Sequence, residues 1–134
     1  NEISNRAASQ TAALDNVKDA SVIITNPTHF AVAIKYEVGE AGAPIILAMG
    51  RGMIAEKIIK LANESDVTIF QSPLLARAIY FTGEIGKEIS ESLYSAIASV
   101  LAYIFKIERG EETDYPDFEI PNELSFDEYG KKIN

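Results

Sequence analysis

Val22 to Tyr36 reads VIITNPTHFAVAIKY, and this stretch holds two runs of β-forming residues on either side of a turn dipeptide. The first run, Val22 to Thr25, is short and mostly β-branched, which favours a strand. The second run, His29 to Tyr36, is apolar over most of its length and predicts a second, largely buried strand. Asn26-Pro27 ends the first strand with a pair of residues typical of turns. The sequence therefore predicts two neighbouring strands joined by a tight connection.

Outside this stretch the patterns predict two further strands and three helices. The strands are expected at residues 44–48 and 67–70, and the helices at residues 53–63, at residues 73–82 and from Ser90 or Ser92 to about residue 107. Ser72 followed by Pro73 is a favoured start for the second helix. The third strand, the first helix and the fourth strand form one βαβ unit, for which a right-handed crossover is expected. The predicted fold class is α/β, with a four-stranded mixed sheet flanked by helices.

The 134 residues fit one folded domain with a polar segment on each side. Residues 1–19 are expected to form a helical linker, and residues 20–109 the domain. Residues 110–134 are expected to form an acidic, largely disordered tail, because their aromatic residues are scattered among acids and prolines. The net charge of the chain is −8, and residues 111–134 contribute −6 of it with eight acidic and two basic residues. The acidity therefore belongs mostly to the tail.

Composition excludes several classes of function. The chain has no cysteine and one histidine, which argues against thiolate zinc sites and against Cys- or Ser-His-type catalysis. The negative charge argues against a nucleic-acid binder, and Gly50-Arg51-Gly52 lacks the spacing of a phosphate loop. No cofactor is expected. No apolar run approaches the ~20 residues of a membrane helix.

Asn26-Pro27 is the one pair in the chain with a distinctive chemistry. Proline has no N–H, so the usual attack of the following backbone nitrogen on the asparagine side chain is closed. The reverse attack remains, in which the side-chain nitrogen of Asn26 attacks its own carbonyl carbon and the proline nitrogen leaves. A tight turn that holds the amide in an attack geometry favours this cleavage, and His29 is placed to relay a proton. The alternative is an ordinary turn with a structural histidine.

The wider string resembles the cleavage region of the export-apparatus switch proteins of type III secretion, the FlhB/YscU family. The hallmark tetrapeptide NPTH stands here as Asn26, Pro27, Thr28 and His29. The resemblance covers about residues 20–108 and continues in Ala43-Pro44 and in the strings GRGMIAEKI (50–58), SPLLARAIY (72–80), EIG (84–86) and LYSAIASVLAYIF (93–105). The segments PLLARAIY (73–80) and EIG (84–86) are closer to the flagellar branch than to the injectisome branch.

The resemblance implies a function that composition alone does not reveal. The parent protein is expected in the bacterial inner membrane, with membrane helices upstream of residue 1 and this chain as its cytoplasmic domain. Asn26 is implied as the attacking residue and Pro27 as the leaving side of a single-turnover self-cleavage, and Thr28 and His29 shape the turn. The expected role is to switch export from rod/hook-type to filament-type substrates. The implied partners are rod, hook and filament proteins, the hook-length control protein and another export-gate component with a large cytoplasmic domain.

The last predicted helix carries more apolar surface than one buried face needs. One stripe contains Leu93, Ile97, Val100 and Ile104, and an adjacent stripe contains Tyr94, Ala98, Leu101 and Phe105. One interpretation is a helix wedged between the sheet and another helix. The other is a shallow docking patch formed by Ala43, Pro44, Ala98 and Leu101, which accepts a short hydrophobic segment of an export substrate.

Three functional interpretations thus remain at the level of the sequence. The first is a self-cleaving regulatory module of a secretion apparatus, which is not a turnover enzyme. The second is a related protein-interaction domain in which the Asn26-Pro27 bond stays intact. The third is a nucleotide-binding α/β enzyme, which lacks any phosphate motif in this sequence.

Overall fold

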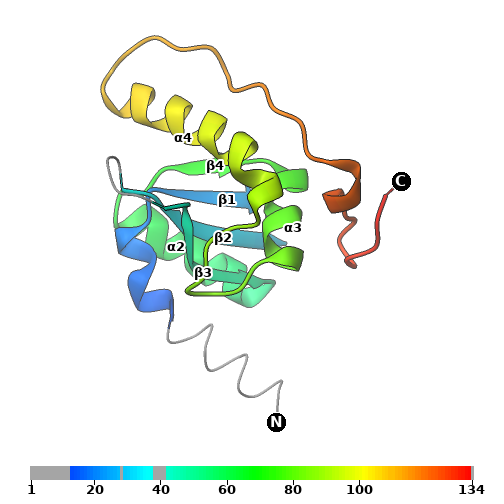
Figure 1. Ribbon diagram of the computed structural model, residues 1–134. Coiled ribbons are helices and arrows are strands. Elements are labelled where there is room, and N and C mark those ends of the chain that lie inside the picture. The colour runs from blue at the N-terminus through cyan, green and yellow to red at the C-terminus, as the bar shows by residue number, and fades with distance from the viewer. Residues whose placement is uncertain (1–12, 28, 38–41, 134) are drawn as a thin grey trace.

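A computed structural model describes residues 13–27, 29–37 and 42–133. Its centre is a four-stranded sheet in the order β3-β2-β1-β4, with helices on both faces (Figure 1). The main elements, in chain order, are β1 (Val22–Asn26), β2 (Phe30–Lys35), β3 (Ile45–Arg51), α2 (Met53–Glu64), β4 (Ile69–Gln71), α3 (Pro73–Thr82) and α4 (Tyr94–Glu108). The predicted α/β class and element order are therefore confirmed.

The sheet is mixed because β1 has two different neighbours. It pairs with β2 antiparallel, with Ile24 opposite Val32, and with β4 parallel, with Ile24 opposite Phe70. β2 in turn pairs antiparallel with β3. β3 and β4 are the two edge strands and run in the same direction, so α2 connects them as the crossover of the predicted βαβ unit.

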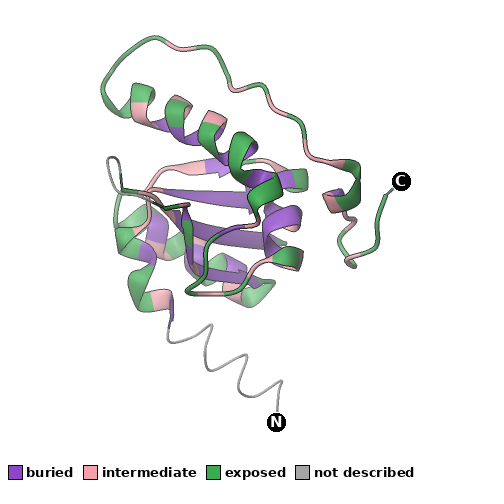
Figure 2. Ribbon diagram, in the orientation of Figure 1, coloured by how far each residue is buried: buried purple, intermediate pink, exposed green. Residues whose placement is uncertain are grey.

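Strand β1 is buried on both faces because both faces of the sheet are covered. Ile23 belongs to the apolar cluster that includes Ile58 and Ala62 of α2, whereas Val22 and Ile24 belong to the cluster beneath α3 and α4. All three side chains are 0% exposed. The strands form the buried interior of the molecule (Figure 2), which explains why β1 reads as a continuous apolar run and not as an alternating one.

Helix α3 begins as expected and α4 begins later. Ser72 is the N-cap residue of α3 and Pro73 is its first residue, although the Ser72 hydroxyl makes no capping hydrogen bond. Ser90 instead precedes a short 3-10 turn, η2 (Glu91–Leu93), and α4 starts at Tyr94. No helix within the described residues is long and apolar enough to cross a membrane.

The segment before the sheet differs from the predicted linker. Residues 1–12 lie outside the described residues. The following 3-10 helix η1 (Leu14–Asp19) packs on the body, because Val17 is 0% exposed and lies in the same cluster as Ile23 and Ile58. A single buried valine provides no periodic signal, so the sequence pattern did not reveal this anchor.

The acidic tail also differs from the prediction of disorder. Residues 111–133 return along the molecule to α3 (Figure 1), and the ring of Phe126 lies 5.6 Å from the ring of Phe81. The short 3-10 helix η3 (Asn122–Leu124) is followed by a small hairpin in which Phe126 pairs with Lys132. Scattered aromatic residues, too few for a core of their own, here pack on aromatic residues of the domain.

Candidate functional site

The NPTH residues form the connection between β1 and β2. Asn26 is the last residue of β1 and pairs with Phe30, so the loop between them contains three residues. The backbone N–H of His29 donates a hydrogen bond to the carbonyl oxygen of Asn26 at 2.9 Å. With Pro27 in the second position, this is the usual arrangement of a hydrogen-bonded β-turn. Asn26 is half-buried, whereas Pro27 and His29 are exposed. Thr28, the remaining predicted site residue, lies outside the described residues.

Both sides of the turn are fixed by hydrogen bonds to other elements. On the β1 side, the backbone N–H of Ser72 donates to the carbonyl oxygen of Thr25 at 2.9 Å. On the β2 side, the backbone N–H of Gly52 donates to the carbonyl oxygen of His29 at 3.0 Å. The Asn26-Pro27 bond is thus held between anchored neighbours while Pro27 itself faces solvent.

The hydrogen bond on the Asn26 carbonyl has a chemical consequence. A donor on a carbonyl oxygen withdraws electron density from the carbonyl carbon and stabilises the negative charge that forms on the oxygen when a nucleophile attacks. The carbonyl concerned is the one next to the Asn26-Pro27 bond. The turn therefore places a donor where an attack at that carbon needs one.

Sequence reasoning missed the residues that support the turn. Gly52 has a positive φ of 58°, which a glycine adopts without strain, and its amide reaches the turn. Arg51 lies over the ring of Phe30, with its guanidinium carbon 5.0 Å from the ring centroid. In the sequence, both residues lie in the Gly50-Arg51-Gly52 string, which lacks the spacing of a phosphate loop and is far from the turn along the chain, so no local pattern linked it to the turn.

A second candidate site is a shallow apolar groove between the β3 start and α4. Its volume is about 400 Å³. All four predicted patch residues, Ala43, Pro44, Ala98 and Leu101, line it. Ala98 is exposed and Ala43 is half-buried, whereas Pro44 and Leu101 are buried and form its floor. The four residues are therefore brought together, but only two of them present side chains at the surface.

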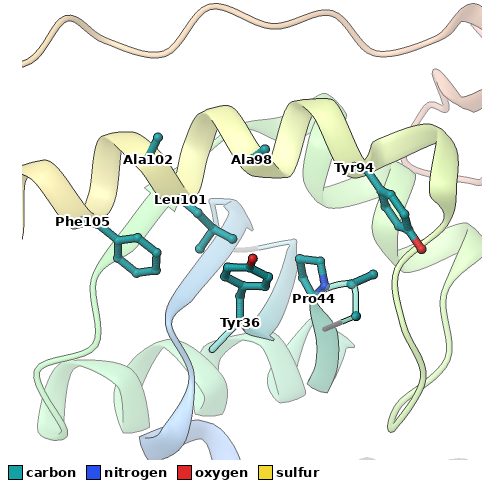
Figure 3. Close-up of a pocket in the computed structure, with 9 residues that line it drawn as sticks. Tyr36, Pro44, Tyr94, Ala98, Leu101, Ala102 and Phe105 are labelled. Carbon is teal, nitrogen blue, oxygen red and sulfur yellow. The ribbon is translucent and has the colours of Figure 1, made fainter. Parts of the chain in front are cut away.

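The groove also has lining residues that the prediction omitted. Tyr36, Tyr94, Ala102 and Phe105 are added around the predicted four, and Tyr36 projects toward Leu101 (Figure 3). The additions on α4 follow from the helical repeat, because Tyr94 and Ala102 lie four residues before and after Ala98. Tyr36 comes from the end of β2, which only the folded chain places beside α4.

Neither site presents a metal-binding set. Among the described residues, no group of three or more His, Cys, Asp or Glu side chains is placed to hold a metal ion.

Comparison with known proteins identifies relatives that cover the whole domain. The FlhB HrpN YscU SpaS Family matches residues 3–104. The flagellar biosynthetic protein FlhB of Salmonella typhimurium is 39% identical over 127 residues, which are 90% of this chain and 33% of that protein. FlhB of Aquifex aeolicus is 41% identical over 99 residues, which are 74% of this chain and 28% of that protein. This chain thus spans about a third of the length of these relatives.

Solved structures agree with the sequence relatives. The cytoplasmic domain of FlhB from Shewanella putrefaciens has a TM-score of 0.78 and 37% identity, and the match covers 87% of this chain and 95% of that one. A mutated EscU C-terminal domain has a TM-score of 0.64 and 30% identity, over 69% of this chain and 91% of that one. The match in sequence runs over most of the domain and the match in structure includes the sheet and its helices, so the chain belongs to the FlhB HrpN YscU SpaS family.

Proposed function

We propose that this chain is the cytoplasmic part of a flagellar export-apparatus protein that cuts its own backbone once between Asn26 and Pro27. The observation that carries the proposal is the turn itself, in which the carbonyl of Asn26 accepts a hydrogen bond from the His29 N–H. The parent protein is proposed to lie in the bacterial inner membrane. The cleavage is proposed to permit the change from rod/hook-type to filament-type export substrates.

The proposed reaction is a cyclisation with a balanced transfer of one proton. The side-chain nitrogen of Asn26 forms a bond to the Asn26 carbonyl carbon, and the bond from that carbon to the Pro27 nitrogen breaks. The proton lost by the amide nitrogen ends on the Pro27 nitrogen, by way of water or of the exposed His29 imidazole. The products are a cyclic imide at residue 26 and a free amine at Pro27. No water is consumed, and the chain has no means of returning to its starting state, so each molecule reacts once.

The apolar groove is proposed as the place where export substrates dock. Its lining residues are almost all apolar, which suits a short hydrophobic segment. The proposed partners are rod, hook and filament proteins, and the hook-length control protein and a second export-gate component are proposed to act on the same apparatus.

We predict that Asn26→Ala abolishes cleavage and leaves the fold intact. Alanine has no amide to close the ring, and residue 26 ends a strand whose other side chains keep their packing. Denaturing gel electrophoresis of purified protein is expected to show residues 1–26 and 27–134 for the parent chain and one uncut band for the variant. Cutting of the Asn26→Ala chain at the same bond would refute cyclisation, and an uncut parent chain would favour a non-cleaving interaction domain.

Pro27→Ala is expected to slow cleavage and to permit deamidation of Asn26.

We predict that the two pieces stay together after cleavage. Val22, Ile23 and Ile24 are fully buried, each worth ~1.5–3 kcal/mol relative to exposure, and ladder hydrogen bonds add ~0.5–1.5 kcal/mol each. Residues 1–26 and 27–134 are expected to elute as one species in native size-exclusion chromatography and to separate in urea.

A matched pair of variants tests which contacts retain the short piece. Ile24→Ala is expected to lower the urea concentration at which the pieces separate, because it leaves a cavity between β1 and the helices. Ile45→Ala, at a side chain that is 39% exposed, is the control and is expected to change it little. Elution of the short piece alone without urea would contradict the proposal.

We predict that Ala98→Asp weakens the docking of export substrates at the groove. Ala98 is exposed, so the variant is expected to fold while it places a charge over an apolar surface. Calorimetric titration with purified flagellar hook protein is expected to show binding at least about tenfold weaker, a change of ~1.4 kcal/mol. Ser95→Asp, an exposed position of α4 outside the groove lining, serves as the control. An equal loss in both variants would mean that charge on α4, and not the groove, decides binding.

A further inference from the structure

The acidic tail occupies a face of the domain that includes α3, β4 and the end of β3. The face is formed by Arg51, Phe70, Arg77 and Phe81, and is called here the aromatic-arginine face. Residues 115–130 of the same chain lie on it and are called the tail segment. This region is separate from the apolar groove between α4 and the start of β3.

Two arginine side chains hold the backbone of the tail segment. The Nε of Arg77 donates to the carbonyl oxygen of Phe126 at 2.6 Å. The Nη2 of Arg51 donates to the carbonyl oxygen of Glu128 at 3.2 Å. Arginine is well suited to such contacts because its guanidinium carries several donors in a fixed plane. Contacts to backbone carbonyls fix the course of a bound chain without demanding particular side chains.

Aromatic rings provide further contacts between the tail segment and the face, beside the partly buried Ile120 and Leu124. Tyr115 is stacked on Phe70 with ring centroids 5.3 Å apart. Phe126 lies against Phe81 at 5.6 Å. Gly130 passes so close to Phe81 that an added Cβ would lie 3.0 Å from the ring. The tail segment thus has two aromatic anchors, eleven residues apart in the sequence.

The tail segment is bound as a peptide on a surface and is not part of the core. Tyr115 remains 64% exposed, and Ser125 is the one described residue of the segment that is buried. Phe118, Ile120 and Leu124 of the segment pack against the core but are only partly buried, and a segment with little fully buried apolar surface opens at a lower free-energy cost than the whole domain. The contacts are therefore sufficient to define a position and weak enough to be exchanged.

Charge favours an acidic ligand on this face. Residues 111–134 carry a net charge of −6. Backbone N–H groups of Lys131 and Tyr129 donate to the Asp127 carboxylate, and these bonds, together with the positive charges of Lys131 and Arg77, lower the pKa of Asp127. Asp127 is accordingly ionised at neutral pH beside Arg77.

We propose that the aromatic-arginine face is a docking surface for an acidic peptide segment with two aromatic anchors, and that the chain's own tail segment fills it as a removable occupant. The partner segment has the chemistry that the tail segment displays: acidic residues, prolines that keep the backbone extended, and rings that reach Phe70 and Phe81. A tethered occupant acts at a high effective concentration, in the millimolar range for short tethers. A free partner therefore binds only the fraction of molecules whose tail has left the face, and its apparent affinity is reduced by that fraction.

The test uses a fluorescently labelled peptide of residues 111–134, added to full-length chains that carry Asn26→Ala so that cleavage plays no part. Binding is followed by fluorescence anisotropy. The chain with its own tail intact is expected to bind weakly. A chain with Phe126→Ala, whose own tail has lost an anchor, is expected to bind the peptide at least about tenfold more tightly. Tyr129→Ala, at a tail side chain that is 74% exposed, is the matched control and is expected to behave as the parent.

Two controls show whether binding occurs at the aromatic-arginine face and depends on the order of the peptide's residues. Arg77→Gln added to the Phe126→Ala chain is expected to weaken peptide binding again, because the donor to the peptide backbone is lost. A scrambled peptide of the same composition is expected not to bind.

The proposal is overturned by any of three results. The peptide binds the parent and the Phe126→Ala chain equally, or it fails to bind the Phe126→Ala chain, or the scrambled peptide binds as well as the native one.

Discussion

Strand β1 is hydrogen-bonded on both of its sides, and the rest of the site depends on that placement. Its antiparallel partner β2 is the next strand along the chain, and its parallel partner β4 arrives only after the α2 crossover. The N–H of Ile23 donates to Thr68 and the carbonyl of Thr25 accepts from Ser72. A strand that is hydrogen-bonded to a neighbouring strand on each side, and packed against apolar side chains on both faces, stays in place without a covalent link to its neighbour. That is the condition under which a break after Asn26 leaves the domain folded.

The residues behind the turn connect it to distant parts of the chain. Phe30, which pairs with Asn26 across the two strands, lies under Arg51 and against Phe81, whose ring centroid is 5.6 Å away. Phe81 and Arg51 are also the residues that meet the tail segment through Phe126 and Glu128. The turn, the edge of β3, helix α3 and the tail therefore share one continuous set of contacts.

Local patterns were sufficient to predict most of the elements. The β-branched run from Val22 predicted β1, Pro73 predicted the start of α3, and Asn26-Pro27 predicted the turn. Asn26 and Pro27 needed no structure to be singled out, because their chemistry is a property of the two residues themselves. The four patch residues line one groove, but Pro44 and Leu101 are buried in it, whereas the prediction was a surface patch.

Features that depend on contacts between distant segments were not predictable in the same way. The adjacency of β1 and β4 is a long-range pairing, so no local pattern encodes the Ser72 bond to Thr25. Tyr36 completes the lining of the groove from the end of β2, and only the fold brings it beside α4. The tail looked disordered because Tyr115 and Phe126 are isolated in the sequence. Their partners, Phe70 and Phe81, lie far upstream in the chain and become available only once β4 and α3 have formed.

Cyclisation at Asn26 is the central claim, and accurate intact masses of the two fresh fragments test it most directly. Cyclisation consumes no water, so the masses of fragments 1–26 and 27–134, quenched in acid as they form, are expected to sum to the mass of the uncut chain. The short fragment is expected to end in a cyclic imide and the long one to begin with Pro27. A sum that exceeds the uncut chain by one water in fragments captured at the earliest times, or a long fragment that begins at another residue, would contradict the account.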